Sequence, residues 1–293
     1  MSPQSVYTLL NQQNGNLAFK VFEFDNNSYF DHIQRNNYFS LILVKRGTGK
    51  ASVDFSEYDF GANTLFTFYP YQPFMLSTKS KMEGFAIQFH HDFFCIHRHH
   101  NEIGCNGVLF NNIYQKPFVI LAEPDQKKML SLVHQIIDEM KLAGVQQDEV
   151  IVSYLKVFLI AATRLKIDQQ SINQSTEIEG KQFFVIQKLK DEIEKNFRIK
   201  HSAGEYAVLL NLSSSALARI TKVYFNKTIS DMISERIIIE AKRELYLTNK
   251  TIKEIAYELG YEDEYYFSRF FKTNADVSPQ LYRETIGFNR GGN

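Results

Sequence analysis

The chain has 293 residues, of which 44% are hydrophobic and 14% aromatic, enough apolar side chains to build the cores of two domains. Only 14 glycines and 6 prolines are present and 23% of the residues are charged, which excludes a collagen-like fibre and a mostly disordered chain. The 33 basic residues balance the 33 acidic ones, so any attraction to nucleic acid must come from local patches rather than from the net charge.

Cysteine content and hydropathy indicate the compartment. Cys95 and Cys105 are too few for a disulfide framework, and residues 1–10 lack the basic and apolar stretches of a secretion signal. The most apolar segment, residues 150–162, is shorter than the ~20 residues that a membrane span needs. We therefore expect a cytoplasmic protein that does not enter the membrane.

The first 121 residues favour β-structure. Short runs rich in β-branched and aromatic residues predict strands at residues 17–21, 38–44, 51–55, 64–69 and 84–89. The two glycines of residues 45–50 predict a tight hairpin between the second and third of these strands. Short strands at regular spacing are typical of a sandwich or a small barrel.

The periodicity becomes helical near Pro124. Apolar residues three and four apart predict amphipathic helices over residues 125–141 and 148–165. Residues 166–180 are mostly polar and follow neither period, which predicts an exposed linker. We therefore expect a first domain at residues 1–165 and a helical second domain at 181–287. Lys181 to Glu284 hold 17 basic and 15 acidic residues, weakly favouring this half as the part that meets an anion.

The helical half contains an internal repeat. Ser202-Ala-Gly-Glu205 and Thr251-Ile-Lys-Glu254 are capping boxes separated by 49 residues, and each predicts the start of a helix. Asn211 and Gly260 follow at the same offset, and both residue types adopt the left-handed conformation that ends a helix. Each copy is therefore expected to form a helix, a short turn and a second helix.

The second helix of each copy should present one polar face. An offset of 50 residues pairs Leu217 with Phe267 on the inner side and places an arginine at the same outer position of both copies. A helix-turn-helix protein needs such an uncluttered second helix to enter a major groove about 12 Å wide. The residues predicted to contact DNA are Ser214, Ser215, Ala218, Arg219 and Lys222 in the first copy and Glu264, Tyr265, Ser268, Arg269 and Lys272 in the second. A helical bundle with an ancestral duplication is the alternative.

Residues 181–283 resemble the AraC/XylS family of bacterial transcription regulators. Residues 252–272, followed by Ser278-Pro279 and Tyr282-Arg283, match the family signature, and residues 236–245 resemble the long helix that joins its two helix-turn-helix units. Where the family commonly has Gly, this chain has Asn226 and Asp276, which tolerate positive φ better than other non-glycine residues.

The resemblance implies roles for the outward residues. Arg219 and Arg269 would contact bases or backbone, and Lys222 and Lys272 would contact phosphates. Ala218 has no hydrogen-bonding side chain, although a thymine methyl could pack against it.

The first half resembles the cupin-type sensor domain common in this family. The expected fold is therefore α+β with two domains: a cupin-like β-barrel with trailing helices, then an all-α domain with two helix-turn-helix units. The expected function is sequence-specific DNA-binding regulation without catalysis, cofactor or metal, interpreted as effector-responsive activation. The implied partners are double-stranded promoter DNA, RNA polymerase, a second subunit paired through the trailing helices, and a small effector in the barrel. Aromatic residues such as Phe66, Phe68, Tyr69, Phe74 and Phe85 are expected mostly to pack in the core, and contact with the effector is the alternative for each of them.

Three alternatives stay open. The first half could form a cupin-type metal-dependent enzyme, but the early strands lack the His-x-His and Glu ligands that such a metal requires. It could instead dimerise without binding an effector, and activation is not separable from repression. The cluster of His97, His99 and His100, flanked by Cys95 and Cys105, fits a solvated loop better than a metal site and is left unassigned.

Overall fold

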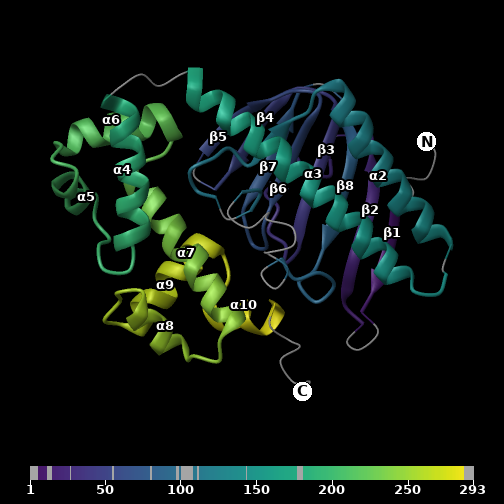
Figure 1. Ribbon diagram of the computed structural model, residues 1–293. Helices are drawn as coiled ribbons and strands as arrows, with labels where there is room; N and C mark the ends of the chain where they lie inside the picture. The colour runs from purple at the N-terminus through teal and green to yellow at the C-terminus, as the bar shows by residue number, and fades with distance from the viewer. Residues whose placement is uncertain are drawn as a thin grey trace. The chain divides into compact units, whose positions relative to one another are not determined.

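The computed structural model describes residues 6–11, 15–26, 28–54, 56–79, 81–96, 99, 108–110, 112–142, 144–176 and 181–286 (Figure 1). The chain divides into two compact units. The first comprises Met1–Asn112 and Lys116–Asn173, and the second comprises Ile113–Gln115 and Gln174–Asn293. None of the helices in the described ranges has the length and hydropathy that a membrane span requires.

The first unit contains two antiparallel sheets. Its strands are β1 (Val6–Leu10), β2 (Leu17–Phe24), β3 (Phe39–Arg46), β4 (Gly49–Val53), β5 (Ser56–Phe60), β6 (Thr64–Phe68), β7 (Phe74–Thr78), β8 (Glu83–Phe89) and β9 (Phe118–Ile120). The larger sheet has the order β1-β2-β8-β3-β6-β9, and the smaller one has the order β5-β4-β7. The five strands predicted from the sequence are confirmed as β2, β3, β4, β6 and β8.

The larger sheet is buried on both faces. Because side chains alternate along a strand, Leu41 and Leu43 of β3 point to one face while Ile42 and Val44 point to the other. The first pair belongs to a core shared with helices α2 (Glu123–Leu142) and α3 (Gln147–Thr176), whereas the second pair belongs to a core shared with the smaller sheet. The unit therefore has three layers: two helices, a six-stranded sheet and a three-stranded sheet (Figure 1).

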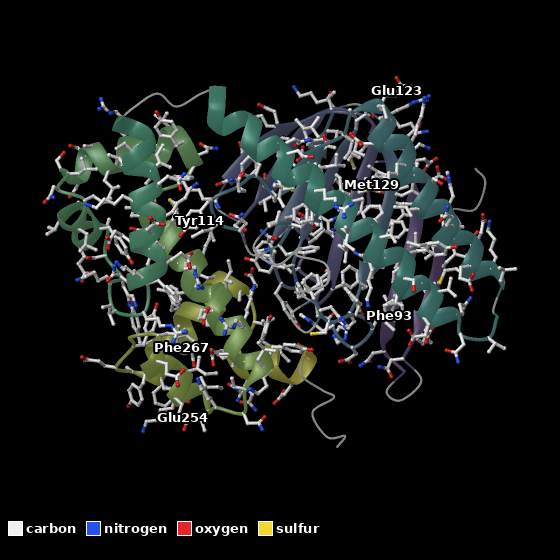
Figure 2. The ribbon with its side chains drawn as sticks, viewed as in Figure 1. Phe93, Tyr114, Glu123, Met129, Glu254 and Phe267 are labelled. Atoms are coloured by element: carbon white, nitrogen blue, oxygen red, sulfur yellow. The ribbon has the colours of Figure 1, made fainter. Side chains whose placement is uncertain are left out.

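The helical layer follows the predicted amphipathic pattern. Met129, Val133 and Ile136 of α2 are buried in the core facing the larger sheet, and Figure 2 labels Met129 on this helix. Leu155 and Phe158 of α3 join the same core. The predicted helices over residues 125–141 and 148–165 are therefore confirmed, but α3 continues through most of the predicted linker, to Thr176.

Two polar residues show why part of that linker is helical. Lys166 is buried and donates hydrogen bonds to the carbonyl oxygens of Lys116 and Phe118, while the Gln169 amide pairs with both the N–H and the carbonyl of Ile120. These contacts fix α3 to β9 through polar groups, so polarity in this stretch did not mean exposure.

The expected order of a β-rich first half followed by helices is confirmed, but the predicted barrel is not closed. The described strands form two separate sheets, and β1 and β9 are the two edges of the larger one. The backbone of Ile120 in β9 is engaged by the side chain of Gln169. This edge is therefore covered by a helix rather than by a further strand.

The predicted hairpin between β3 and β4 is also wrong. β3 pairs with β6 and β8, whereas β4 pairs with β5 and β7, so residues 47 and 48 carry the chain from one sheet to the other. A Cβ atom on Gly49 would lie 2.2 Å from the carbonyl oxygen of Ser77. The glycine therefore permits close approach to β7 rather than a two-strand turn.

The five aromatic residues, expected mostly to pack in the core, belong to two cores. Phe66, Phe68 and Phe74 lie between the sheets, where the rings of Phe68 and Phe74 stack at 3.8 Å and those of Phe66 and Phe68 at 5.7 Å. Phe85 and Tyr69 pack in the core on the helical side. The five side chains therefore pack against their neighbours in separate layers and do not line one common space.

The second unit is helical, as predicted. Its helices are α4 (Lys181–Asn196), α5 (Ala203–Leu209), α6 (Ser214–Phe225), α7 (Ile229–Leu247), α8 (Ile252–Glu258), α9 (Glu264–Ala275) and α10 (Pro279–Ile286). Helices α5 and α6 form one helix-turn-helix, α8 and α9 form the other, and α7 connects them (Figure 1).

Candidate nucleic-acid interface

Each helix-turn-helix begins at a capping box. The Glu205 carboxylate accepts hydrogen bonds from the Oγ and backbone N–H of Ser202, at 2.7 and 3.0 Å, and these bonds lower the pKa of Glu205. At the start of α8, Thr251 N–H donates to the Glu254 carboxylate at 2.6 Å, while Glu254 N–H donates to the Thr251 hydroxyl at 3.2 Å. The hydrogen bond from the Thr251 backbone is the main reason why the pKa of Glu254 is lowered.

The turns have the left-handed residues that the repeat predicted. Asn211 has φ 54° and Gly260 has φ 81°, and each ends the first helix of its helix-turn-helix. Asn226 and Asp276, which replace the usual glycines, have φ 54° and 61° after α6 and α9. The departure from the family pattern therefore leaves these turns intact.

The second helices are amphipathic. Leu217 in α6 and Phe267 and Phe271 in α9 are buried, and Figure 2 labels Phe267. The predicted DNA-facing residues lie on the opposite side. Those of α6 (Ser214, Ser215, Ala218, Arg219 and Lys222) are all exposed, and so are Tyr265, Arg269 and Lys272 of α9, while Glu264 and Ser268 are partly exposed.

The two second helices begin differently. Ser213 caps α6, and its hydroxyl accepts a hydrogen bond from Ala216 N–H at 3.2 Å. Asp263 caps α9, and its carboxylate accepts from Tyr265 N–H at 2.6 Å and Tyr266 N–H at 3.2 Å. An uncharged cap therefore starts the first outward-facing helix, and a charged cap starts the second.

Four cations on the outward faces have no partner within the described part of the chain. Arg219, Lys222, Arg269 and Lys272 are exposed, and none of them makes a hydrogen bond or an ion pair with any described residue. An exposed, unpaired cation keeps its full charge available for a phosphate or a base edge. The pair formed by an arginine and a lysine three positions later is repeated on α6 and α9.

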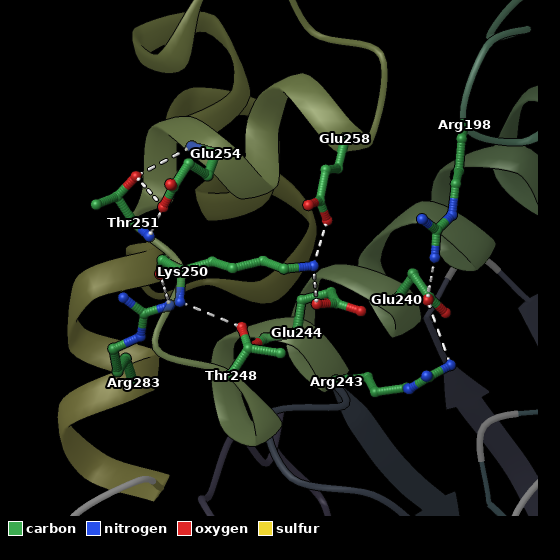
Figure 3. Close-up of polar contacts among 10 residues, drawn as sticks. All are labelled: Arg198, Glu240, Arg243, Glu244, Thr248, Lys250, Thr251, Glu254, Glu258 and Arg283. Carbon is green, nitrogen blue, oxygen red and sulfur yellow. Dashed lines mark hydrogen bonds and ion pairs between the residues drawn. The ribbon is translucent and has the colours of Figure 1, made fainter.

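Three arginines on the body of the helical domain share one carboxylate instead. Arg198 and Arg243 bind the buried Glu240 carboxylate at 2.6 and 3.3 Å (Figure 3), and Arg236 binds its other oxygen at 3.1 Å. Burial alone would raise the pKa of Glu240, but the arginines, with Arg236 contributing most, outweigh it and lower the pKa. Glu240 thereby joins the α4–α5 connection to α7.

A second ionic cluster holds α8 and α10 to α7. Lys250 Nζ lies 3.0 Å from the Glu244 carboxylate of α7 and 2.6 Å from the Glu258 carboxylate of α8 (Figure 3). Arg283 of α10 donates to the carbonyl oxygens of Lys250 and Leu245, at 2.6 and 3.3 Å. These contacts fix the second helix-turn-helix to the connecting helix.

The two helix-turn-helix units also touch each other directly. The rings of His201 and Tyr261 lie 4.8 Å apart, one before α5 and the other in the turn before α9. A Cβ on Gly260 would lie 2.2 Å from the carbonyl oxygen of Arg198, so this turn packs closely on the backbone that leads into α5. The outward faces of α6 and α9 are therefore carried by one continuous scaffold.

The sequence interpretation missed the residues of this scaffold. Arg236, Glu240 and Arg243 are spaced four and three residues apart, a pattern that brings side chains together on a helix and could have identified the cluster. Lys250 binds carboxylates six and eight positions away, which is not a helical spacing, and Arg283 binds carbonyl groups 33 and 38 positions away, so no local pattern reveals these contacts.

In the first unit, no group of three or more His, Cys, Asp or Glu residues within the described ranges is placed to hold a metal ion. His97, His100 and Cys105 lie outside the described residues. Cys95 is buried and not disulfide-bonded, and the ring of His99 stacks on Phe94 at 5.0 Å.

Comparison with known proteins agrees with this geometry. Residues 206–285 match a family model described as a helix-turn-helix domain. The chain is 30% identical over 125 residues to an uncharacterized HTH-type transcriptional regulator in the cgkA 5′ region of Pseudoalteromonas carrageenovora, covering 41% of this chain and 74% of that protein. It is also 30% identical over 95 residues to the raffinose operon transcriptional regulatory protein RafR of Pediococcus pentosaceus, covering 32% of this chain but only 34% of the relative.

Two solved structures are also among the proteins to which this chain is similar. The C-terminal domain of AraT, a response regulator from Geobacillus stearothermophilus, is 27% identical, with 37% of this chain and 91% of that chain covered and a TM-score of 0.36. ToxT from Vibrio cholerae O395 is 16% identical, with 99% and 98% covered and a TM-score of 0.40.

The duplicated helix-turn-helix and its outward faces define a DNA-binding protein of the transcription-regulator class. The sequence matches place it more closely: the chain belongs to the AraC/XylS family of helix-turn-helix regulators, which confirms the resemblance found in residues 181–283.

Proposed function

We propose that this protein is a sequence-specific transcription regulator in which α6 and α9 of one chain enter two successive major-groove segments of promoter DNA. The observation that carries the proposal is the repeated outward face: two helices present an arginine and a lysine at matching positions, and none of the four cations has a partner among the described residues. A helix-turn-helix uses its second helix in this way.

The residues divide by their chemistry. Arg219 and Arg269 can form bidentate hydrogen bonds to guanine, and Lys222 and Lys272 supply point charges for phosphates. The small residues Ser214, Ser215 and Ala218 allow α6 to approach the base edges closely, and Ala218 can pack on a thymine methyl. On α9 the contacts would come from Glu264, Tyr265, Ser268, Arg269 and Lys272.

The first unit would act as the sensor and dimerisation domain. A raffinose operon regulator among the relatives supports control by a small metabolite, and the activators among them support a contact with RNA polymerase. The helices α2 and α3 are candidates for pairing with a second subunit. In this role the protein has no catalytic activity and works in the cytoplasm.

The test is selection of bound sequences from a random DNA library with the full-length protein, at two salt concentrations and with metal content measured on the same sample. We expect a motif of two blocks about one helical turn, ~34 Å, apart. Failure to enrich any sequence, together with stoichiometric metal, would overturn the proposal in favour of a metalloenzyme.

Two matched variants assign the blocks. Arg219→Ala and Arg269→Ala remove the same side chain from equivalent positions of α6 and α9. Each is expected to weaken binding by about 1–3 kcal/mol and to relax the preference in one block only, if the arginine reads a base. Equal loss on every sequence would make that arginine a phosphate contact.

A further inference from the structure

The two outward faces differ at one end. The cations at the C-terminal end are the same in both helices, whereas the residues nearer the N-terminus are not. The differing pairs are Ser214 and Glu264, Ser215 and Tyr265, and Ala218 and Ser268. Because the N-terminal residues of a recognition helix reach the base edges, the two helices should read different bases.

Glu264 is the difference with the clearest chemical meaning. It is the first residue of α9, is partly exposed, and makes no hydrogen bond or ion pair with any described residue. Its carboxylate is not used for capping, since Asp263 already accepts the Tyr265 and Tyr266 N–H groups. By contrast, the carboxylates of Glu205 and Glu254 are both engaged in capping boxes.

A carboxylate at this position costs affinity unless it meets a donor. Together with Glu262 and Asp263, Glu264 forms three consecutive acidic residues at the end of α9 that would approach DNA, where phosphates repel them. In the major groove only two bases offer an amino donor: cytosine through N4 and adenine through N6. Adenine places its N7 acceptor beside that amino group, and this acceptor would repel a carboxylate, so cytosine is the better partner.

We propose that Glu264 is a specificity-determining residue whose carboxylate accepts a hydrogen bond from N4 of a cytosine in the block read by α9. The proposal rests on the DNA-reading function proposed above. The block read by α9 then requires a cytosine at one position. The corresponding position of the α6 block, opposite Ser214, tolerates several bases because a hydroxyl both donates and accepts.

The substitution Glu264→Gln tests this assignment. An amide of the same shape pairs with adenine N6 and N7, so the preferred base at one position should change from cytosine to adenine by roughly tenfold in relative affinity, measured by selection and by competition between two duplexes. Ser214→Glu is the reciprocal variant, and it should create a cytosine preference in the α6 block.

Glu262→Gln is the matched control. It removes the same charge two residues earlier, in the turn before α9, where Glu262 is exposed and has no partner among the described residues. It should raise affinity for all sequences by a similar factor and leave the base preferences unchanged.

The outcomes separate the two proposals. If the unaltered protein selects no two-block motif, both the DNA-reading function and the role of Glu264 are wrong. If it selects two blocks and Glu264→Gln behaves like Glu262→Gln, with a uniform gain and no change of base, Glu264 acts through its charge alone and only the specificity assignment is overturned.

Discussion

Replacing Lys222 and Lys272 with alanine tests whether the repeated lysine of α6 and α9 binds phosphate. Both side chains are exposed and lack a partner among the described residues, so their loss should leave the helical unit folded. Alanine also has the highest helix propensity, which favours retention of α6 and α9.

The expected size of the effect follows from counterion release. Each phosphate contact contributes about 0.9 to the slope of log affinity against log salt, so the double variant should lower that slope by about 1.8. Between 50 and 200 mM salt, one such contact accounts for about a 3.5-fold loss of affinity and two for about a 12-fold loss. The variant should therefore bind more weakly at low salt and lose less affinity as salt rises.

Fluorescence anisotropy titrations at four salt concentrations, with a selected duplex and a scrambled one, measure this slope. Lys127→Ala/Lys128→Ala is the control, since it removes two exposed positive charges from α2 in the other unit. The phosphate role would be refuted if the Lys222→Ala/Lys272→Ala variant had the same slope of log affinity against log salt as the control and the unaltered protein. A reduced slope on one duplex only would indicate base reading by the lysines.

Two further predictions concern stability. Burial lowers the pKa of Lys166 to about 7, so between pH 7 and its unfolded value of 10.5 the folded chain binds fewer protons than the unfolded chain and stability rises with pH. This residue should raise the free energy of unfolding by up to roughly 1.4 kcal/mol per pH unit, and the rise should disappear in Lys166→Met. Urea unfolding at several pH values measures it, and an unchanged pH dependence in the variant would contradict the prediction. Gly260→Ala should destabilise the helical unit by more than about 1 kcal/mol, because φ is 81° and the new Cβ would meet the Arg198 carbonyl oxygen at 2.2 Å. In Gly204→Ala the new Cβ of α5 would meet no atom within 4 Å, so this variant should stabilise the helical unit by about 0.5–1 kcal/mol. A similar melting temperature for the two variants would disprove the packing argument.

The helical half was largely predictable because its boundaries are encoded locally. Thr251 and Glu254 satisfy each other's backbone, and Asn211 and Gly260 take the left-handed conformation within a few residues of the helix that they end. The repeat provided a second copy against which each assignment could be compared. The outward faces followed from helical spacing alone.

The first half was less predictable because strand partners are chosen at a distance. β5 buries only Ser56 and Phe60, and β9 has three residues, so neither shows a strong pattern. At residues 45–50 the local glycines suit a hairpin, but the strands that pair with β3 are β6 and β8, so the predicted hairpin is wrong. The linker was predicted at Lys166 because the residue is polar. A buried, hydrogen-bonded lysine and a solvated one cannot be distinguished in the sequence.

The close packing of Gly260 on the Arg198 backbone bears on the spacing of the DNA sites that the protein would bind. Because the two helix-turn-helix units pack on each other, their contact sets the distance between the two outward helices in this structure. Adding one base pair between the two DNA blocks would turn one of them by about 36° and shift it by about 3.4 Å. If α6 and α9 read two DNA blocks as proposed, target promoters would be free to change the bases of the spacer but not its length, and a search for them should hold the spacing constant while leaving the intervening bases unspecified.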